Sequence, residues 1–86
     1  MSHREKLLRR FLAKPADFRF DEMQTLLEGF GYEEIRTGKA SGSRVAFVHR
    51  PNGHIIRLHR PHPGNIVKRY QMELVEEALR GKGVIE

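Results

Sequence analysis

The first third of the chain carries apolar residues at helical spacing in two separate stretches. Within residues 2–13 they recur three and four positions apart among charged residues, which predicts a short amphipathic helix with a face of Leu7, Leu8, Phe11 and Leu12. Lys14 precedes Pro15, and a residue before proline avoids the α region, so this helix is expected to end there. A second helix is predicted over residues 21–28, just before Gly29, with an apolar face of Met23, Leu26, Leu27 and Phe30.

The middle of the chain changes to a period of two, which is typical of strands. Strands are predicted over residues 32–37, 44–49 and 54–59. In the second strand Val45, Phe47 and His49 alternate with Arg44, Ala46 and Val48; in the third, Ile56 and Leu58 alternate with Ile55, Arg57 and His59. The intervening Pro51-Asn52-Gly53 predicts a hairpin turn, because Asn-Gly tolerates positive φ.

A third helix is predicted over residues 66–80, with a buried face of Val67, Tyr70, Leu74, Val75, Ala78 and Leu79. The element order is therefore α-α-β-β-β-α. The economical fold is α+β, with one small three-stranded antiparallel sheet and helices packed on one of its faces. Because 86 residues leave too little chain for a second core, we expect a single domain over residues 1–86.

Composition excludes several classes of protein. The chain has no cysteine, so disulfides, thiolate metal sites and a cysteine nucleophile are impossible, which suits a reducing cytoplasm. Its apolar runs are only a few residues long, too short to span a membrane, and residues 1–4 lack the apolar stretch of a signal peptide. Glycine-rich phosphate loops and the nucleophile-elbow motif are missing as well. We therefore expect a cytoplasmic protein without a membrane segment.

Positive charge is concentrated in one segment. Residues 35–72 contain eight lysines and arginines, four of the five histidines and no aspartate or glutamate, whereas the whole chain carries a formal net charge of +5. Like charges crowded together destabilise a compact state. The segment therefore predicts a site for a polyanion, and nucleic acid is the commonest one. A basic surface without a specific partner is the alternative.

Five cations of this segment are the expected phosphate contacts: Arg44, Arg57, Arg60, Lys68 and Arg69. Lys68 and Arg69 stand near the start of the last predicted helix, where the helix dipole disfavours cations. A bound anion would reverse that effect, and helix N-termini bind phosphate well. A merely tolerated surface is the alternative explanation for these two residues.

Histidines supply the candidate acid–base chemistry. His59 and His62 are the candidate catalytic residues, because imidazole titrates near neutral pH. Cleavage of RNA needs a base for the ribose 2′-OH, an acid for the leaving 5′ oxygen and cations for the extra charge. No cysteine or carboxylate stands beside these histidines to complete a metal-ligand set, so neither a metal nor a cofactor is expected. His49 and His54 are expected to be structural residues at strand ends.

Several segments, in their order and spacing, resemble the HicA toxins of bacterial toxin–antitoxin systems. They are Leu26-Leu27-Glu28-Gly29-Phe30-Gly31-Tyr32, Gly42-Ser43-Arg44, residues 55–64 ending in His62-Pro63-Gly64, and Gly83-Val84-Ile85 after the last helix. The resemblance spans most of a core of residues 20–85 and leaves an extra N-terminal helix within residues 1–14. It implies a double-stranded-RNA-binding-like fold, metal-independent cleavage of messenger RNA, and neutralisation by a HicB antitoxin.

One position departs from the family's pattern. The family motif is Gly-Ser-His, whose histidine is regarded as catalytic, but here the third residue is Arg44. Arginine stays protonated and cannot act as a base near neutral pH, although it suits phosphate binding. Either another histidine has taken over the catalytic role, with His59 and His62 nearest in kind, or the protein binds RNA without cutting it. A DNA-binding accessory protein is a further alternative.

Overall fold

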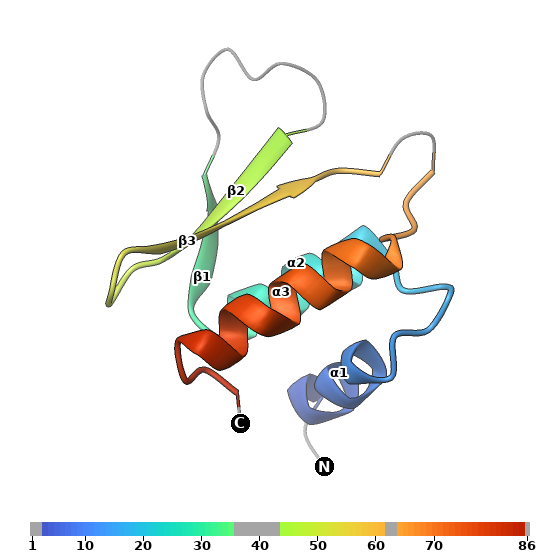
Figure 1. Ribbon diagram of the computed structural model, residues 1–86, viewed down its shortest axis with the longest axis horizontal. Helices are drawn as coiled ribbons and strands as arrows, with labels where there is room; N and C mark the ends of the chain where they lie inside the picture. The colour runs from blue at the N-terminus through green and yellow to red at the C-terminus, as the bar shows by residue number, and fades with distance from the viewer. Residues whose placement is uncertain (1–2, 36–43, 62–63, 86) are drawn as a thin grey trace.

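The computed structural model describes residues 3–35, 44–61 and 64–85. Within these residues the chain forms the helices α1 (His3–Leu12), α2 (Phe20–Gly29) and α3 (Arg69–Gly81) and the strands β1 (Tyr32–Ile35), β2 (Arg44–His49) and β3 (His54–His59) (Figure 1). The predicted α+β class and the order α-α-β-β-β-α are confirmed.

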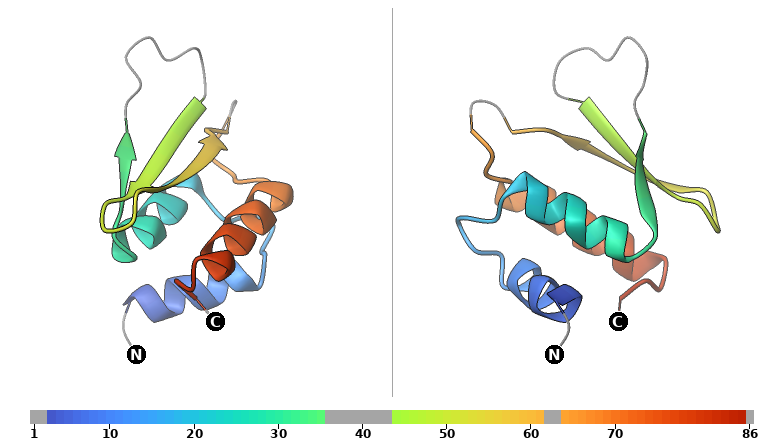
Figure 2. Two further views of the ribbon diagram at one scale, coloured as in Figure 1. Left: turned by 60° about the vertical axis from the view of Figure 1, so that its left-hand side comes forward. Right: turned by 180° about the vertical axis from the view of Figure 1, so that it is seen from behind.

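The strands form one antiparallel sheet in the order β1-β2-β3, so β2 is central and β1 and β3 are the edges. Figure 2 shows α2 and α3 together on one face of this sheet and α1 on the far side of these two helices. The opposite sheet face is covered by no helix of the described residues. Helices on one face of the sheet were predicted, and this arrangement is confirmed.

The core lies between the covered sheet face and the helices. Phe20 and Met23 of α2, Phe47 of β2 and Val75 of α3 are almost completely buried. The rings of Phe20 and Phe47 lie with their centroids 6.4 Å apart. Burying a side chain of this kind stabilises a fold by about 1.5–3 kcal/mol relative to leaving it exposed. The strand face that bears Phe47 therefore has to face the helices.

Helix α1 contributes to the same core and is tied to both other helices. Its Phe11 is fully buried in the cluster. Arg10 donates a hydrogen bond to the Glu22 carboxylate of α2 at 2.9 Å, and Lys14, two residues after the end of α1, forms an ion pair with Glu76 of α3. Packing and charge together hold the extra N-terminal helix against the other two.

The start of α3 differs from the predicted helix over residues 66–80, because α3 begins only at Arg69. The preceding residues are extended and pair with the segment before α2: the Val67 amide donates to the Phe18 carbonyl, and the Phe20 amide to the Asn65 carbonyl, each at 2.8 Å. The backbone groups that the prediction assigned to the first turn of the helix are therefore bonded to the segment before α2 instead.

The buried face of α3 also differs from the prediction. Tyr70 and Leu74 were expected in the core, but they are 58% and 48% exposed, and Gln71 and Met72 are buried in their place. The helix carries two neighbouring apolar rows at helical spacing, and the core takes the row of Met72, Val75 and Leu79. Val75 and Leu79 were predicted to be buried, and this is confirmed.

The remaining boundaries are close to those expected. The second and third strands have their predicted limits, and the hairpin between them has Gly53 at φ 73°. The first strand was predicted over residues 32–37; it spans Tyr32–Ile35, and residues 36–37 lie outside the described residues. Of the helices that the structure describes, none has the length and apolar character needed to cross a membrane.

Candidate nucleic-acid interface

Strand register brings three of the predicted site residues onto one sheet face. Arg44 of β2 stands opposite His59 of β3, and Ala46 stands opposite Arg57. Because residues directly opposite one another in an antiparallel pair point to the same face, Arg44, Arg57 and His59 share the face that no described helix covers. All three are exposed, whereas the alternating Ile56 and Leu58 are buried against the helices.

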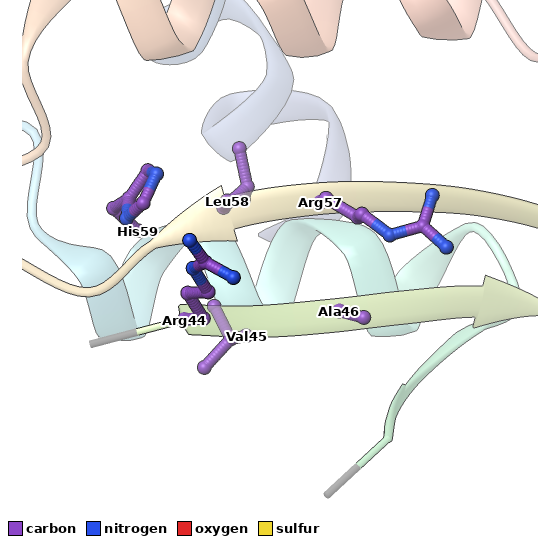
Figure 3. A pocket seen from close by; sticks show the side chains of 6 residues that line it. All are labelled: Arg44, Val45, Ala46, Arg57, Leu58 and His59. Atoms are coloured by element: carbon purple, nitrogen blue, oxygen red, sulfur yellow. The ribbon is translucent and has the colours of Figure 1, made fainter. Parts of the chain in front are cut away.

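These residues line an open pocket of about 370 Å³ together with Val45, Ala46 and Leu58 (Figure 3). Figure 3 shows Arg44 and His59 at the adjacent ends of β2 and β3, while the Arg57 side chain extends along β3 away from His59. Ala46 has only a methyl group opposite Arg57, which leaves space between the two guanidinium groups. The pocket thus has cationic side chains on two sides and a small residue between them.

Neither Arg44 nor Arg57 forms an ion pair with any residue that the structure describes. Arg50, by contrast, lies just beyond the other end of β2 and binds Glu33 at 2.9 Å. A guanidinium group offers a planar set of N–H donors that matches a phosphate in two-point contact. The charge of this face is therefore available to an anionic ligand.

His59 is held through its backbone rather than through its ring. Its N–H donates to Gln71 Oε1 at 2.8 Å, and Gln71 Nε2 donates to the His59 carbonyl at 2.9 Å. Gln71 is only 6% exposed. These two bonds join the end of β3 to the first turn of α3 and so position the imidazole. Nothing in the sequence pattern had pointed to Gln71, because an isolated glutamine in a helix is usually a surface residue.

Arg60 lies apart from the pocket. Its Nη2 is 3.3 Å from Glu34 Oε2, and its Cζ lies 4.7 Å above the centre of the Phe20 ring. Glu34 stands opposite Phe47 in the β1–β2 register and hence faces the helices. Arg60 is thus engaged on the covered side of the sheet, and its contact with phosphate remains a prediction.

Lys68 and Arg69 lie where α3 begins. Lys68 is the N-cap residue, and its carbonyl accepts hydrogen bonds from the amides of Gln71 and Met72. Arg69 makes an exposed contact of 3.4 Å with Glu73. Because Gln71 binds His59, the start of α3 lies beside the end of β3. An anion site at this helix N-terminus remains a prediction, and His62 lies outside the described residues.

The other histidines of the sheet lie at its hairpin end. The Tyr32 hydroxyl is 2.8 Å from His54 Nδ1, and His49 Nδ1 is 3.0 Å from Asn52 Oδ1. Burial raises the pKa of the Tyr32 hydroxyl; burial, followed by the nearby Lys82 and His49, lowers the pKa of His54. A neutral His54 can accept the Tyr32 hydroxyl proton in a hydrogen bond. These residues thus bind one another at the opposite end of β3 from His59.

The pocket offers cations and one titratable ring. In residues 3–35, 44–61 and 64–85, no group of three or more His, Cys, Asp or Glu side chains is placed to hold a metal ion. A phosphate bound to the Arg44 guanidinium group would lie beside the His59 imidazole, with Arg57 further along β3. Such a site can bind a nucleic-acid backbone and can move one proton at that phosphate.

A protein-family model described as the HicA toxin of bacterial toxin–antitoxin matches residues 20–79 of the chain. The matched segment begins with α2, includes the whole described sheet and ends within α3, so α1 lies outside it. No match was found to a curated protein or to a solved structure. The likeness to double-stranded-RNA-binding folds therefore remains a prediction.

Proposed function

Because the chain belongs to the HicA toxins of bacterial toxin–antitoxin systems, we propose that it binds and cuts messenger RNA as a metal-independent endoribonuclease. The observation that carries the proposal is the pocket in which Arg44, beside His59, and Arg57, further along β3, have no counter-ions among the described residues. The toxin would act in the cytoplasm, and a HicB-like antitoxin protein would neutralise it. Arg60, Lys68 and Arg69 would extend the RNA contact beyond the pocket.

The proposed reaction is transfer of the RNA phosphate to the neighbouring 2′ oxygen. One imidazole, from His59 or His62, takes the proton of the 2′-OH, and the 2′ oxygen attacks phosphorus. The bond from phosphorus to the 5′ oxygen breaks, and the other imidazole, in its protonated form, gives that oxygen a proton. The products are a 2′,3′-cyclic phosphate and a 5′-hydroxyl. Arg44 and Arg57 would stabilise the charge that builds up on the phosphate oxygens.

Cleavage assays on RNA in the presence of EDTA test the enzymatic part of the proposal. His59→Ala or His62→Ala should lower the rate by about 10²–10⁴, the usual contribution of a general acid or base, while RNA binding survives. His3→Ala, at an exposed position at the start of α1, is the matched control and should cut at the parental rate. Parental rates in both test variants would refute the roles assigned to these histidines.

Salt-dependent RNA binding tests the phosphate contacts. Each neutralised phosphate on single-stranded RNA contributes about −0.7 to the slope of log K against log salt. Arg44→Ala, Arg57→Ala and the pair Lys68→Ala with Arg69→Ala should each reduce the slope. Arg50→Ala, which removes a cation already paired with Glu33, should leave the slope unchanged. A flat salt dependence in the parent would contradict binding through phosphates.

A second candidate function is RNA binding without cleavage. It is favoured by Arg44, which stands where the family pattern has its histidine and which cannot serve as a base. In that case the parent protein binds RNA but leaves it intact at every pH. Competition with duplex DNA of equal charge separates both functions from that of a DNA-binding accessory protein, because only RNA offers the 2′-OH.

A further inference from the structure

The outer edge of β3 presents backbone groups that the fold leaves unpaired. Both backbone groups of His59 point away from β2, because Gln71 binds them there. Backbone groups of successive residues in a strand point to alternate sides, so those of Ile55 and Arg57 also point outward. Within the described part of the chain, no residue forms a hydrogen bond with these outward groups.

Helix α3 carries apolar side chains past this edge. Residues in a helix follow one another at about 100°. From Gln71, which reaches the edge, Leu74 and Tyr70 therefore lie further round the helix, on the side away from the core-facing Met72 and Val75. A shallow groove between the start of β3 and α3 includes His54, Leu74 and Ala78 among its lining residues. The exposed Leu74 thus lies where a further strand of the sheet would cover it.

We propose that this edge accepts a fourth strand from the antitoxin partner; the inference rests on the proposed function, which supplies that partner. The backbone of the added strand would pair with Ile55 and Arg57. Its side chains on the helix side would cover Leu74, which is about half exposed in the free protein. Gln71 already occupies the backbone groups of His59, so the added strand must end before that residue.

The positive charge beside the outer edge of β3 favours one kind of partner strand. Side chains on the other face of the added strand would lie beside Ile55 and Arg57, next to the unpaired cations of the pocket. A second copy of this chain would present the same basic strand, since residues 35–72 contain no aspartate or glutamate. Because like charges opposite one another destabilise a strand pair, a second copy is disfavoured as the occupant. The occupant is therefore an extended segment of a different protein, in which apolar residues alternate with carboxylates.

Hydrogen exchange gives a direct test. The toxin is co-expressed with the product of the adjacent gene, and amide exchange is compared in the complex and in the free toxin. The amides of Ile55 and Arg57 should exchange at least about tenfold more slowly in the complex, as expected for amides that gain hydrogen bonds. The amide of His59 is the internal control, because Gln71 already binds it in the free protein.

A substitution on the exposed surface of α3 tests the same interface by measuring the affinity of the complex. Leu74→Lys should weaken the complex by about tenfold or more while leaving RNA cleavage unchanged. Thr25→Lys, which puts the same charge at an exposed position of α2, should change neither. Loss of cleavage in the parent with protection intact would reject the enzymatic proposal alone. Three results would overturn the strand addition: no complex, a complex without protection of Ile55 and Arg57, or the same protection produced by RNA or by a second copy of the toxin.

Discussion

Gln71 joins the end of β3 to α3, and its substitution by methionine tests how the pocket is built. Gln71→Met keeps the length of the side chain and removes both hydrogen bonds to His59. A buried polar group left without a partner costs about 1–3 kcal/mol. Water can reach an edge strand, so we expect a loss of about 1–2 kcal/mol in the free energy of unfolding. For a domain of this size, that lowers Tm by roughly 4–16 °C.

Urea unfolding followed by circular dichroism measures this loss. The control is Gln24→Met, which removes the hydrogen bond of 2.7 Å from Gln24 to Glu34 at a less buried position and should cost less than about 0.5 kcal/mol. Because Gln71 positions His59, kcat for RNA should fall in Gln71→Met, with little change in KM. Parental stability and parental kcat together would refute the argument that these bonds hold the site.

The variant Gln71→Glu adds a pH signature that a purely packing role would not produce. A carboxyl group has both a donor and an acceptor for the His59 backbone only when it is protonated. The folded state would therefore raise its pKa above the ordinary value of about 4.3. Relative to the parent, the variant should be most stable below about pH 4 and should lose stability as the pH rises through the raised pKa. An equal difference from the parent at every pH would contradict the hydrogen-bonding role.

Three further predictions follow from other contacts. Arg10 lowers the pKa of Glu22, and Lys14 and Arg80 lower the pKa of Glu76, so these ion pairs stabilise the folded state above about pH 4.3 and lose this effect as the pH falls through the lowered pKa values. Glu76→Gln should therefore reduce the difference in the free energy of unfolding between about pH 7 and pH 3, measured by urea unfolding. Gly31→Ala should lower the free energy of unfolding by about 1–2 kcal/mol, because φ is 94° and an added Cβ would lie 3.3 Å from the His49 ring. Gly81→Ala is the control: its Cβ would meet open space, so it should not destabilise the protein. Arg44→His should raise RNA cleavage by about tenfold or more if a base at this position serves the reaction, and an unchanged rate would exclude that role.

The alternation of the strands was predictable because each residue type matches its face. Phe47 and Ile56 are apolar and are expected to be buried. Because side chains alternate between the two faces of a strand, the intervening Arg44, Arg57 and His59 are expected on the exposed face. The hairpin turn fixed the register between β2 and β3, and with it the pair of Arg44 and His59. The residues that the pocket brings together were thus accessible from sequence.

The surroundings of the pocket were less accessible. Arg60 comes after the last strand position, where no period applies, and its contacts with Glu34 and Phe20 join segments far apart in the chain. In α3, two apolar rows compete for the core, and periodicity does not rank them. The choice depends on the pairing of Val67 with Phe18 and on the bond between Gln71 and His59, both of which are tertiary contacts. Tyr70 and Leu74 were therefore misassigned to the core.

His59 lies where the two proposed binding surfaces meet. Its side chain is on the open face with Arg44 and Arg57, while its backbone closes the free edge of β3 through Gln71. Arg57 belongs to both surfaces, because its guanidinium group faces the pocket and its backbone faces the edge. A strand that pairs with Arg57 would bring carboxylates to the cation that RNA phosphate needs. An inhibitor would therefore exclude RNA by electrostatic competition at the pocket, without having to cover the whole sheet face.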